Sequence, residues 1–306
     1  RTLAGALLAW AALLATPGLA PAATAETRAI RVAVYALPPG LGNPYTGTGM
    51  PSVLTWPAIF ETLTVMGADG RLQPLLATAW ERRDATTWRF ALRRGVSFSN
   101  GEAFDAAAVA RALDYLATVE GRATPVGRDL AVIAGHRVLD PHTIELLTRE
   151  PAPLLPELVS SLRIVAPQQW RRLGPAGFAA APVGTGPFVV ERWQGAQVRL
   201  ARNPRAWRPP RLDRLEIVEL PDAASRVQGI QAGRIDVAVQ LGPDDEEPLR
   251  AAGAHLETRP AGGVLTLQFI TERADSPLRD ARVRQALNLA TDREQIARVL
   301  FRGRTV

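Results

Sequence analysis

Residues 182–238 read PVGTGPFVVERWQGAQVRLARNPRAWRPPRLDRLEIVELPDAASRVQGIQAGRIDVA, and this stretch decides the fold. It begins with a Gly-Thr-Gly-Pro turn at 184–187, after which alternating apolar residues predict a two-stranded hairpin. A strand over Leu215–Leu220, a helix that begins after Asp222 and a strand over Ile235–Val239 follow, with Gly233 placed to end the helix. Because one helix joins the two strands, we expect them to be parallel, with a right-handed crossover.

The residues before this stretch mix both kinds of element. Ile30–Leu37 alternates as a first strand, and a loop rich in glycine and proline follows it. Ser52 is placed to cap one helix, and Asp105 is placed to cap an alanine-rich helix that runs to about Val119. Arg137–Thr148 predicts a hairpin that turns at Asp140 and Pro141. This order indicates an α/β unit that carries an α+β insertion.

The C-terminal residues predict one strand and two helices. Val264–Thr271 is largely apolar, which is typical of a buried strand. Ser276 and Pro277 then open a helix that carries Val283 and Leu287 on one face. Thr291 and Glu294 form a capping box for the last helix, which we expect to end at Gly303.

The composition excludes several classes of chemistry. The chain of 306 residues has no cysteine, and all 36 of its basic residues are arginine, so disulfides, cysteine-bound metals and lysine-dependent catalysis are excluded. The formal net charge is +6, but the arginines are scattered among acids, so we expect no nucleic acid partner. His136 and His142 lack a zinc-ligand spacing, and hydrolase motifs are absent. We therefore expect no metal, no cofactor and no enzyme activity.

Residues 1–25 are typical of an export signal. Leu3–Ala15 is an apolar run that is too short to cross a bilayer, and Pro17 and Gly18 interrupt it. Ala23-Thr24-Ala25 then supplies a cleavage pattern of small residues. We expect cleavage after Ala25 and a periplasmic, soluble mature protein. A buried core helix and an N-terminal membrane anchor are the alternatives for the apolar run.

Four blocks of sequence resemble a known family. They occur in the order expected for the extracytoplasmic solute-binding proteins of ABC importers, of the dipeptide, oligopeptide and nickel class (family 5). The blocks are Phe60–Leu63 with Asp69–Trp80, Trp88–Asp105, the stretch at 182–238, and Ser276–Asp280 with Val283–Asn288. Together they extend over about Ile30–Gly303, which is nearly the whole chain after the export signal.

The resemblance implies an α/β fold with two lobes that enclose the ligand. Residues 26–51 and 182–269 would form the first lobe, and residues 52–181 an inserted α+β subdomain. Residues 270–306 would begin a second lobe that is mostly missing, so the resemblance identifies the chain as C-terminally truncated. The strand over Val264–Thr271 would then contain a hinge.

The function implied is the capture of a short peptide or another small polar solute, followed by delivery to an ABC permease in the inner membrane. A full-length protein of this kind is expected to be a monomer. The alternatives are a periplasmic chaperone, a sensor-input protein on the same fold, and a non-functional truncated product. Whether the ligand is a dipeptide, an oligopeptide, a metal chelate or another solute stays open.

Four residues are the predicted ligand contacts. Tyr45 and Met50 lie in the loop after the first strand, where ligands approach an α/β sheet, and similar loops in the family reach the ligand. Trp56 follows that loop, and packing beneath it is the alternative for all three residues. Arg163 lies near the place where nickel-type relatives hold an anionic chelate with arginine. The residue that matches their arginine here is Ser160, so this chain departs from that pattern, and a surface ion pair is the alternative for Arg163.

Overall fold

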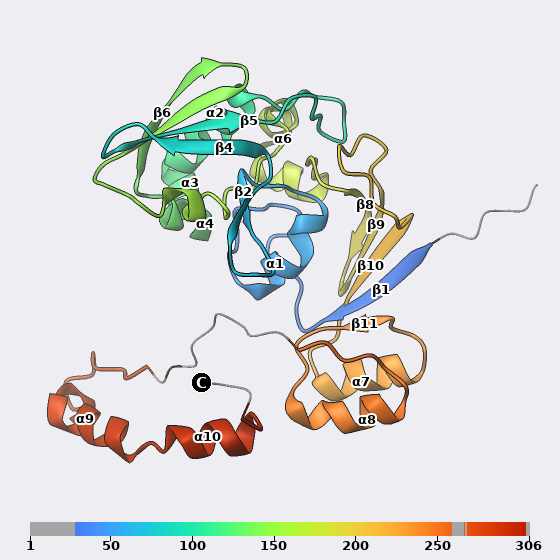
Figure 1. The fold of residues 1–306 in the computed structure, drawn as a ribbon, viewed down its shortest axis with the longest axis vertical. Coiled ribbons are helices and arrows are strands. Elements are labelled where there is room, and N and C mark those ends of the chain that lie inside the picture. Colours follow the sequence, from blue (N-terminus) through green and yellow to red (C-terminus); the bar gives the residue numbers. More distant parts are fainter. Residues whose placement is uncertain (1–27, 259–265, 267, 304–306) are drawn as a thin grey trace, which may run out of the picture.

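The computed structural model describes residues 28–258, 266 and 268–303 (Figure 1). Its first sheet has five strands in the order β11-β1-β10-β9-β8. The strands are β1 (Ala29–Val34), β8 (Phe188–Gln194), β9 (Gln197–Arg202), β10 (Arg214–Glu219) and β11 (Val237–Ala238).

The parallel part of this sheet is built around β1. β1 pairs in parallel with β10 on one side and with β11 on the other, so the two strands of the strand–helix–strand unit are parallel, as predicted. The helix between them, α7 (Ala223–Gln231), begins after Asp222, and Gly233 follows it with a φ of 64°. A φ in the left-handed region favours glycine, which explains why the helix ends there. β8 and β9 form the predicted antiparallel hairpin.

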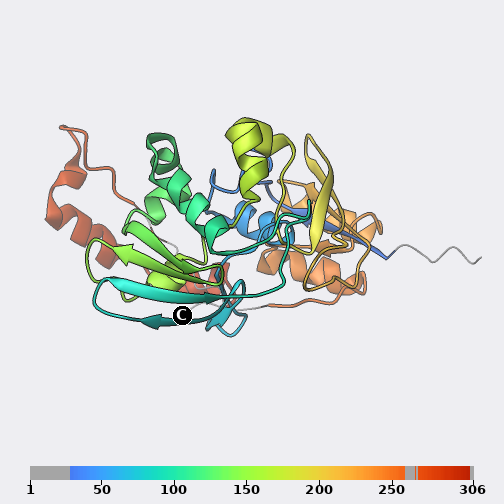
Figure 2. The same ribbon diagram turned by 90° about the horizontal axis from the view of Figure 1, so that it is seen from above.

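The second sheet is antiparallel, with the order β4-β5-β7-β6. Its strands are β4 (Ala77–Arg82), β5 (Thr87–Leu92), β6 (Ile133–Asp140) and β7 (Thr143–Thr148). The helices α2 (Ala106–Ala117), α3 (Val119–Ala123) and α4 (Pro125–Asp129) lie on one face of this sheet (Figure 2). The predicted cap of α2 is confirmed, because the Asp105 carboxylate accepts a hydrogen bond from the Ala108 N–H at 3.0 Å.

Shorter elements connect the two sheets. They are α1 (Met50–Thr55), β2 (Thr64–Met66), β3 (Leu72–Pro74), α5 (Leu155–Leu158) and α6 (Pro167–Ala180). The prediction that Ser52 caps α1 is wrong, since the cap residue is Gly49 and Ser52 lies inside the helix. Pro51 explains the earlier start, because proline fits the first turn of a helix. After Thr55 the chain continues directly as one 3-10 turn over Trp56–Ala58, with Pro57 in its first positions.

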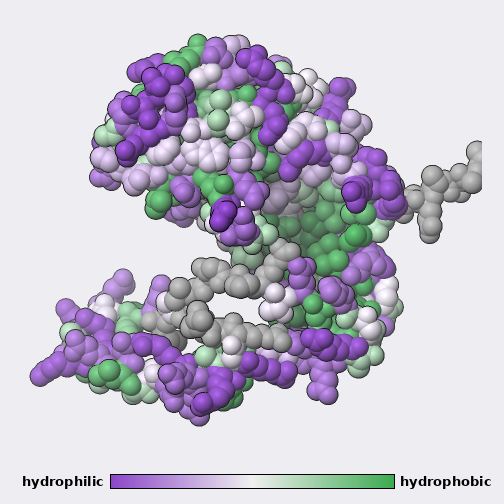
Figure 3. Space-filling view, in the orientation of Figure 1, coloured by the Kyte–Doolittle hydropathy of each residue, from purple (hydrophilic) through white to green (hydrophobic). Residues whose placement is uncertain are grey.

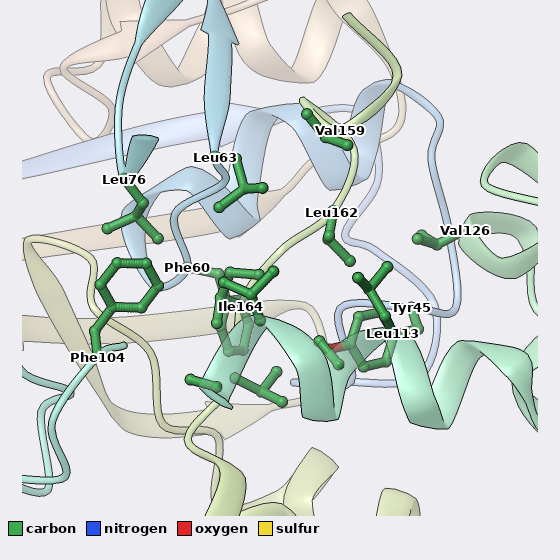
Figure 4. Packing of buried hydrophobic residues seen from close by; sticks show 14 of the residues in the cluster. Tyr45, Phe60, Leu63, Leu76, Phe104, Leu113, Val126, Val159, Leu162 and Ile164 are labelled. Carbon is green, nitrogen blue, oxygen red and sulfur yellow. The ribbon is translucent and has the colours of Figure 1, made fainter. Parts of the chain in front are cut away.

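One hydrophobic core extends through both sheets. Phe60, Leu63, Leu76 and Ile164 lie at its centre, where Phe60 stacks on Phe178 with ring centroids 6.2 Å apart (Figure 4). Each such side chain contributes roughly 1.5–3 kcal/mol by leaving water.

Glu61 joins the segment between α1 and β2 to the residues before β8 and after β9 by polar contacts. Its carboxylate is 2% exposed and accepts hydrogen bonds from Thr185 Oγ1 at 2.9 Å, Trp207 Nε1 at 2.7 Å and Arg208 Nη2 at 2.7 Å. Thr185 belongs to the turn that opens the β8–β9 hairpin, and Glu61 directly follows the central Phe60. A buried charge is tolerated only when it is paired and fully hydrogen-bonded, and here three donors meet that condition.

The C-terminal residues lie apart from this core. After α8 (Glu246–Ala251), the chain leads to α9 (Ala281–Ala290) and α10 (Arg293–Leu300), and neither of these last two helices buries a side chain completely. In Figure 3 an open gap separates them from the upper part of the molecule. An ion pair between Arg302 and Asp244, at 3.0 Å, links this segment to the residues before α8.

Two predictions for this segment are wrong. Residues 264, 265 and 267 of the predicted strand lie outside the described residues, but Gln268–Thr271 form no strand, and Ile270 is 68% exposed. No described strand lies beside them to pair with their backbone groups, and a strand needs such a partner. The last helix is capped by Asp292 instead of Thr291, since the Asp292 carboxylate accepts from the Gln295 N–H at 2.8 Å. Nowhere in residues 28–258 and 268–303 is a helix both long and apolar enough to cross a membrane.

Candidate solute-binding region

The loop between β1 and α1 lies at the carboxyl end of a parallel strand. In open α/β sheets this end of the strands is where ligands bind. The loop is fastened to the rest of the body, because the Gly42 N–H donates to the Ala179 carbonyl at 3.0 Å and the Trp56 indole N–H donates to the Leu41 carbonyl at 3.3 Å. Its backbone therefore has a defined course before any ligand arrives.

Tyr45 lies inside the molecule beneath this loop. Its side chain has no exposed surface and packs against Tyr115 of α2 and Trp170 of α6, with ring centroids 5.5 Å and 5.3 Å away. Figure 4 shows it beside Leu113 and close to Leu162 and Ile164. The hydroxyl has no hydrogen-bond partner among the described residues, and burial raises the pKa of Tyr45 well above its ordinary value.

Arg163 is buried without a counter-charge. Its side chain is 6% exposed, and the guanidinium lies over the Trp56 ring, 5.0 Å from the centroid. Within the described part of the chain, no carboxylate and no hydrogen-bond acceptor meets that guanidinium, and Nη1 is closed off from solvent. Desolvation lowers the pKa of Arg163 to about 10. The surface ion pair considered for Arg163 is therefore not what the structure contains.

Met50 lies at the start of α1 and is 46% exposed, so its side chain is available at the surface. Trp56 has no exposed surface. The structure thus brings Trp56 and Arg163 into contact, places Tyr45 within electrostatic reach of Arg163, and leaves Met50 outside this buried group.

Two further polar residues of this region were not predicted from the sequence. Thr55 precedes Trp56, and its hydroxyl is also buried without a partner among the described residues. Thr62 forms an isolated β-bridge with Arg163, which fixes the backbone that carries the guanidinium. Residues 62 and 163 are far apart in the sequence, so no local pattern could reveal this pairing.

Comparison with known proteins gives the family. Residues 71–306 match the model of bacterial extracellular solute-binding proteins, family 5. The chain belongs to this family. Its α/β fold is the fold of periplasmic binding proteins: OppA of Burkholderia pseudomallei matches 91% of the chain with a TM-score of 0.74 and 23% identity. An ABC transporter substrate-binding protein from Sinorhizobium meliloti matches 90% of it, with a TM-score of 0.66 and 29% identity.

Curated relatives of this family-5 chain are named for several ligands. The nickel-binding periplasmic protein of Escherichia coli is 28% identical over 248 residues, which cover 78% of this chain and 47% of that protein. The glutathione-binding protein GsiB of Salmonella choleraesuis is 26% identical over 268 residues, or 85% of this chain and 52% of that protein. The chain thus spans about half the length of the curated relatives that it matches.

Proposed function

We propose that the protein is the solute-binding component of an ABC importer, which captures a short peptide or another small polar solute and delivers it to a membrane permease. The membership of family 5 and the periplasmic-binding-protein fold support this proposal. The relatives named for nickel and glutathione bind small solutes, and the family is one of binding proteins instead of enzymes. Export with cleavage after Ala25, and a monomer in solution, belong to the same proposal.

Within this function, the buried charge of Arg163 is the observation that points to a site. Holding a guanidinium away from water without a partner costs free energy, and such a cost is typical of a site that a ligand completes. Nη1 of Arg163 and the hydroxyl of Tyr45 both lack a partner among the described residues, and an anionic oxygen of the solute would satisfy both. The loop of residues 42–50 would have to shift for a solute to reach Tyr45, and the exposed Met50 would then lie at the entrance.

The test is a calorimetric screen of the purified protein against dipeptides, tripeptides, glutathione and nickel chelates. We expect at least one of these solutes to bind. Arg163→Met keeps the volume of the side chain and removes its charge, so it should weaken that binding by about tenfold or more, equivalent to about 1.4 kcal/mol. Arg171→Gln removes an exposed charge on α6 and should leave the affinity unchanged.

The chaperone alternative has a different signature in the same preparation. If no solute binds but the protein suppresses aggregation of an unfolded client, the importer proposal is wrong. If a solute binds and Arg163→Met leaves its affinity intact, the importer function stands and the assignment of Arg163 fails.

A further inference from the structure

A groove of about 520 Å³ lies between α2, α4 and the edge strand β6 of the antiparallel sheet. Its wall is apolar where Leu113, Leu116, Leu130 and Ile133 line it. None of the residues of the candidate solute-binding region is among its lining residues. Tyr45 packs on Tyr115 of α2 and lies beside Leu113, which also lines the groove, so the two places adjoin at this one residue. The groove is otherwise distinct from the place proposed for the solute.

The rim of this groove carries more unpaired positive charge than negative charge. Asp114 is the only carboxylate among its lining residues, and it is already paired with His136 Nε2 at 2.9 Å and with Arg111 at 3.5 Å. Arg122 and Arg149 also line the groove and are exposed, and neither guanidinium has a carboxylate or a hydrogen-bond partner in the described ranges. The rim thus offers two free cations beside an apolar wall.

One glycine of the groove is required by the packing of the helices around it. A Cβ added to Gly127 would lie 2.0 Å from the Gly121 carbonyl, so glycine at this position allows α3 to pack on α4. In β6, His136 faces α2 through its contact with Asp114.

We propose that this groove is a second binding site, for an amphipathic carboxylate that places its apolar part against Leu113, Leu116 and Ile133 and its carboxylate between Arg122 and Arg149. The volume is that of an ordinary small-molecule site, which is mostly apolar with a few polar groups that orient the ligand. Arginine binds carboxylates through paired, charge-assisted hydrogen bonds, which gives the two free guanidiniums a chemical role. A free organic acid and the C-terminal end of an apolar peptide share this chemistry.

Calorimetry of the whole chain with octanoate and with octanamide tests the charge requirement. The two probes have the same apolar tail, and only octanoate carries the carboxylate. We expect octanoate to bind at least about tenfold more tightly than octanamide, because a charged acceptor roughly doubles the strength of a hydrogen bond. Equal binding of the two probes would overturn the proposal.

Three variants place the binding in the groove. Arg149→Gln and Arg122→Gln should each weaken octanoate binding by about fivefold or more, whereas Arg171→Gln, which removes an equal charge from α6, should not change it. If either of the two arginine variants folds normally and still binds octanoate as tightly as the wild type, the site lies elsewhere and the proposal is wrong.

A comparison with a short peptide distinguishes the two possible ligands, a free organic acid and the C-terminal end of a peptide. Acetyl-Leu-Leu with a free carboxylate is compared with its amide and with octanoate. Tighter binding of the peptide acid assigns the groove to a peptide end, and tighter binding of octanoate assigns it to a free acid. Because no residue of the solute-binding region lines the groove, the Arg122 and Arg149 variants should leave the affinity for the imported solute unchanged, so either proposal can fail without the other.

Discussion

Residues 28–258 and 268–303 form helices from similar sequence patterns, but only the first region packs them. Helix α2 buries seven of its side chains, whereas α9 and α10 bury none, and Leu289 is 86% exposed. The interactions that stabilise α9 and α10 are local, because Asp280 and Asp292 accept hydrogen bonds from backbone N–H groups in the first turn of each helix. The comparison separates what a cap achieves from what tertiary packing achieves, and helices in proteins draw most of their stability from packing.

The comparison predicts the largest loss of stability when a side chain is removed from the centre of the core. Phe60→Ala should lower the free energy of unfolding by about 3–5 kcal/mol, because it removes a fully packed ring next to Phe178. Leu289→Ala in α9 should stay within about 0.5 kcal/mol, since its side chain is already in solvent. Urea unfolding followed by tryptophan fluorescence measures both. Similar losses for the two variants would mean that α9 is packed in solution, which would remove the contrast.

The next largest effect concerns the hydrogen bonds that the Glu61 carboxylate accepts in the first region. Glu61→Leu should cost about 3 kcal/mol or more, because it leaves the buried Thr185 hydroxyl and the half-buried Trp207 indole without an acceptor and breaks the ion pair with Arg208. Glu81→Leu, which removes a carboxylate from a surface ion pair with Arg83, should cost no more than about 1 kcal/mol. Chemical unfolding of the two variants side by side is the measurement. A Glu61 variant as stable as the Glu81 variant would contradict the role of Glu61 in holding the segment between α1 and β2 against the first sheet.

Arg163→Met should have the opposite sign and raise the free energy of unfolding by about 1–2 kcal/mol, because it removes an uncompensated buried charge. The folded pKa of about 10 lies below the ordinary value of an arginine, so the unfolded chain holds the proton more tightly. The penalty is therefore complete well below pH 10 and falls as the pH rises through 10 towards the ordinary pKa of arginine. The difference in stability between variant and wild type should shrink over that range. A variant that is less stable than wild type at pH 7 would show that Arg163 is compensated.

The smallest effect belongs to the cap of α10. Asp292→Ala should cost about 1 kcal/mol of local helix stability, because it removes the acceptor for the Gln295 N–H. Hydrogen exchange of the amides of α10 should rise, while the unfolding midpoint of residues 28–258 stays where it is. A shift of the global midpoint instead would mean that α10 folds cooperatively with the body.

Much of the fold could be predicted from residues that act locally. Asp105 caps α2, Gly233 follows α7, and the Gly-Thr-Gly-Pro turn opens the β8–β9 hairpin, because caps and turns depend on a few neighbouring side chains. The start of α1 was missed because Pro51 in its first turn outweighed Ser52 as a cap. The strand predicted over 264–271 is wrong for Gln268–Thr271, because apolar composition alone does not supply a partner strand.

The candidate site was harder to predict for a related reason. The sequence favoured Tyr45, Met50, Trp56 and Arg163 by their position and type, but it could not tell that Tyr45 and Trp56 have no exposed surface while Met50 does. Burial of these residues depends on α2, α6 and the segment around Arg163, which come from distant parts of the chain. The groove beside β6 was not predicted at all, because Leu113, Arg122 and Arg149 share no motif.

The position of β1 in the middle of its sheet sets the order in which the molecule can be assembled. β1 starts at Ala29, yet both of its neighbours, β10 and β11, come from residues after 213. At about 5–20 residues per second, the ribosome needs roughly 10–40 s to supply them, and until then the Ile30–Val34 segment has two bare edges. The antiparallel sheet, whose strands are nearer in sequence, can close during that interval. The nascent chain therefore carries an aggregation-prone segment near its N-terminus until β10 and β11 have been made, and we expect its yield on synthesis to depend on a holding chaperone.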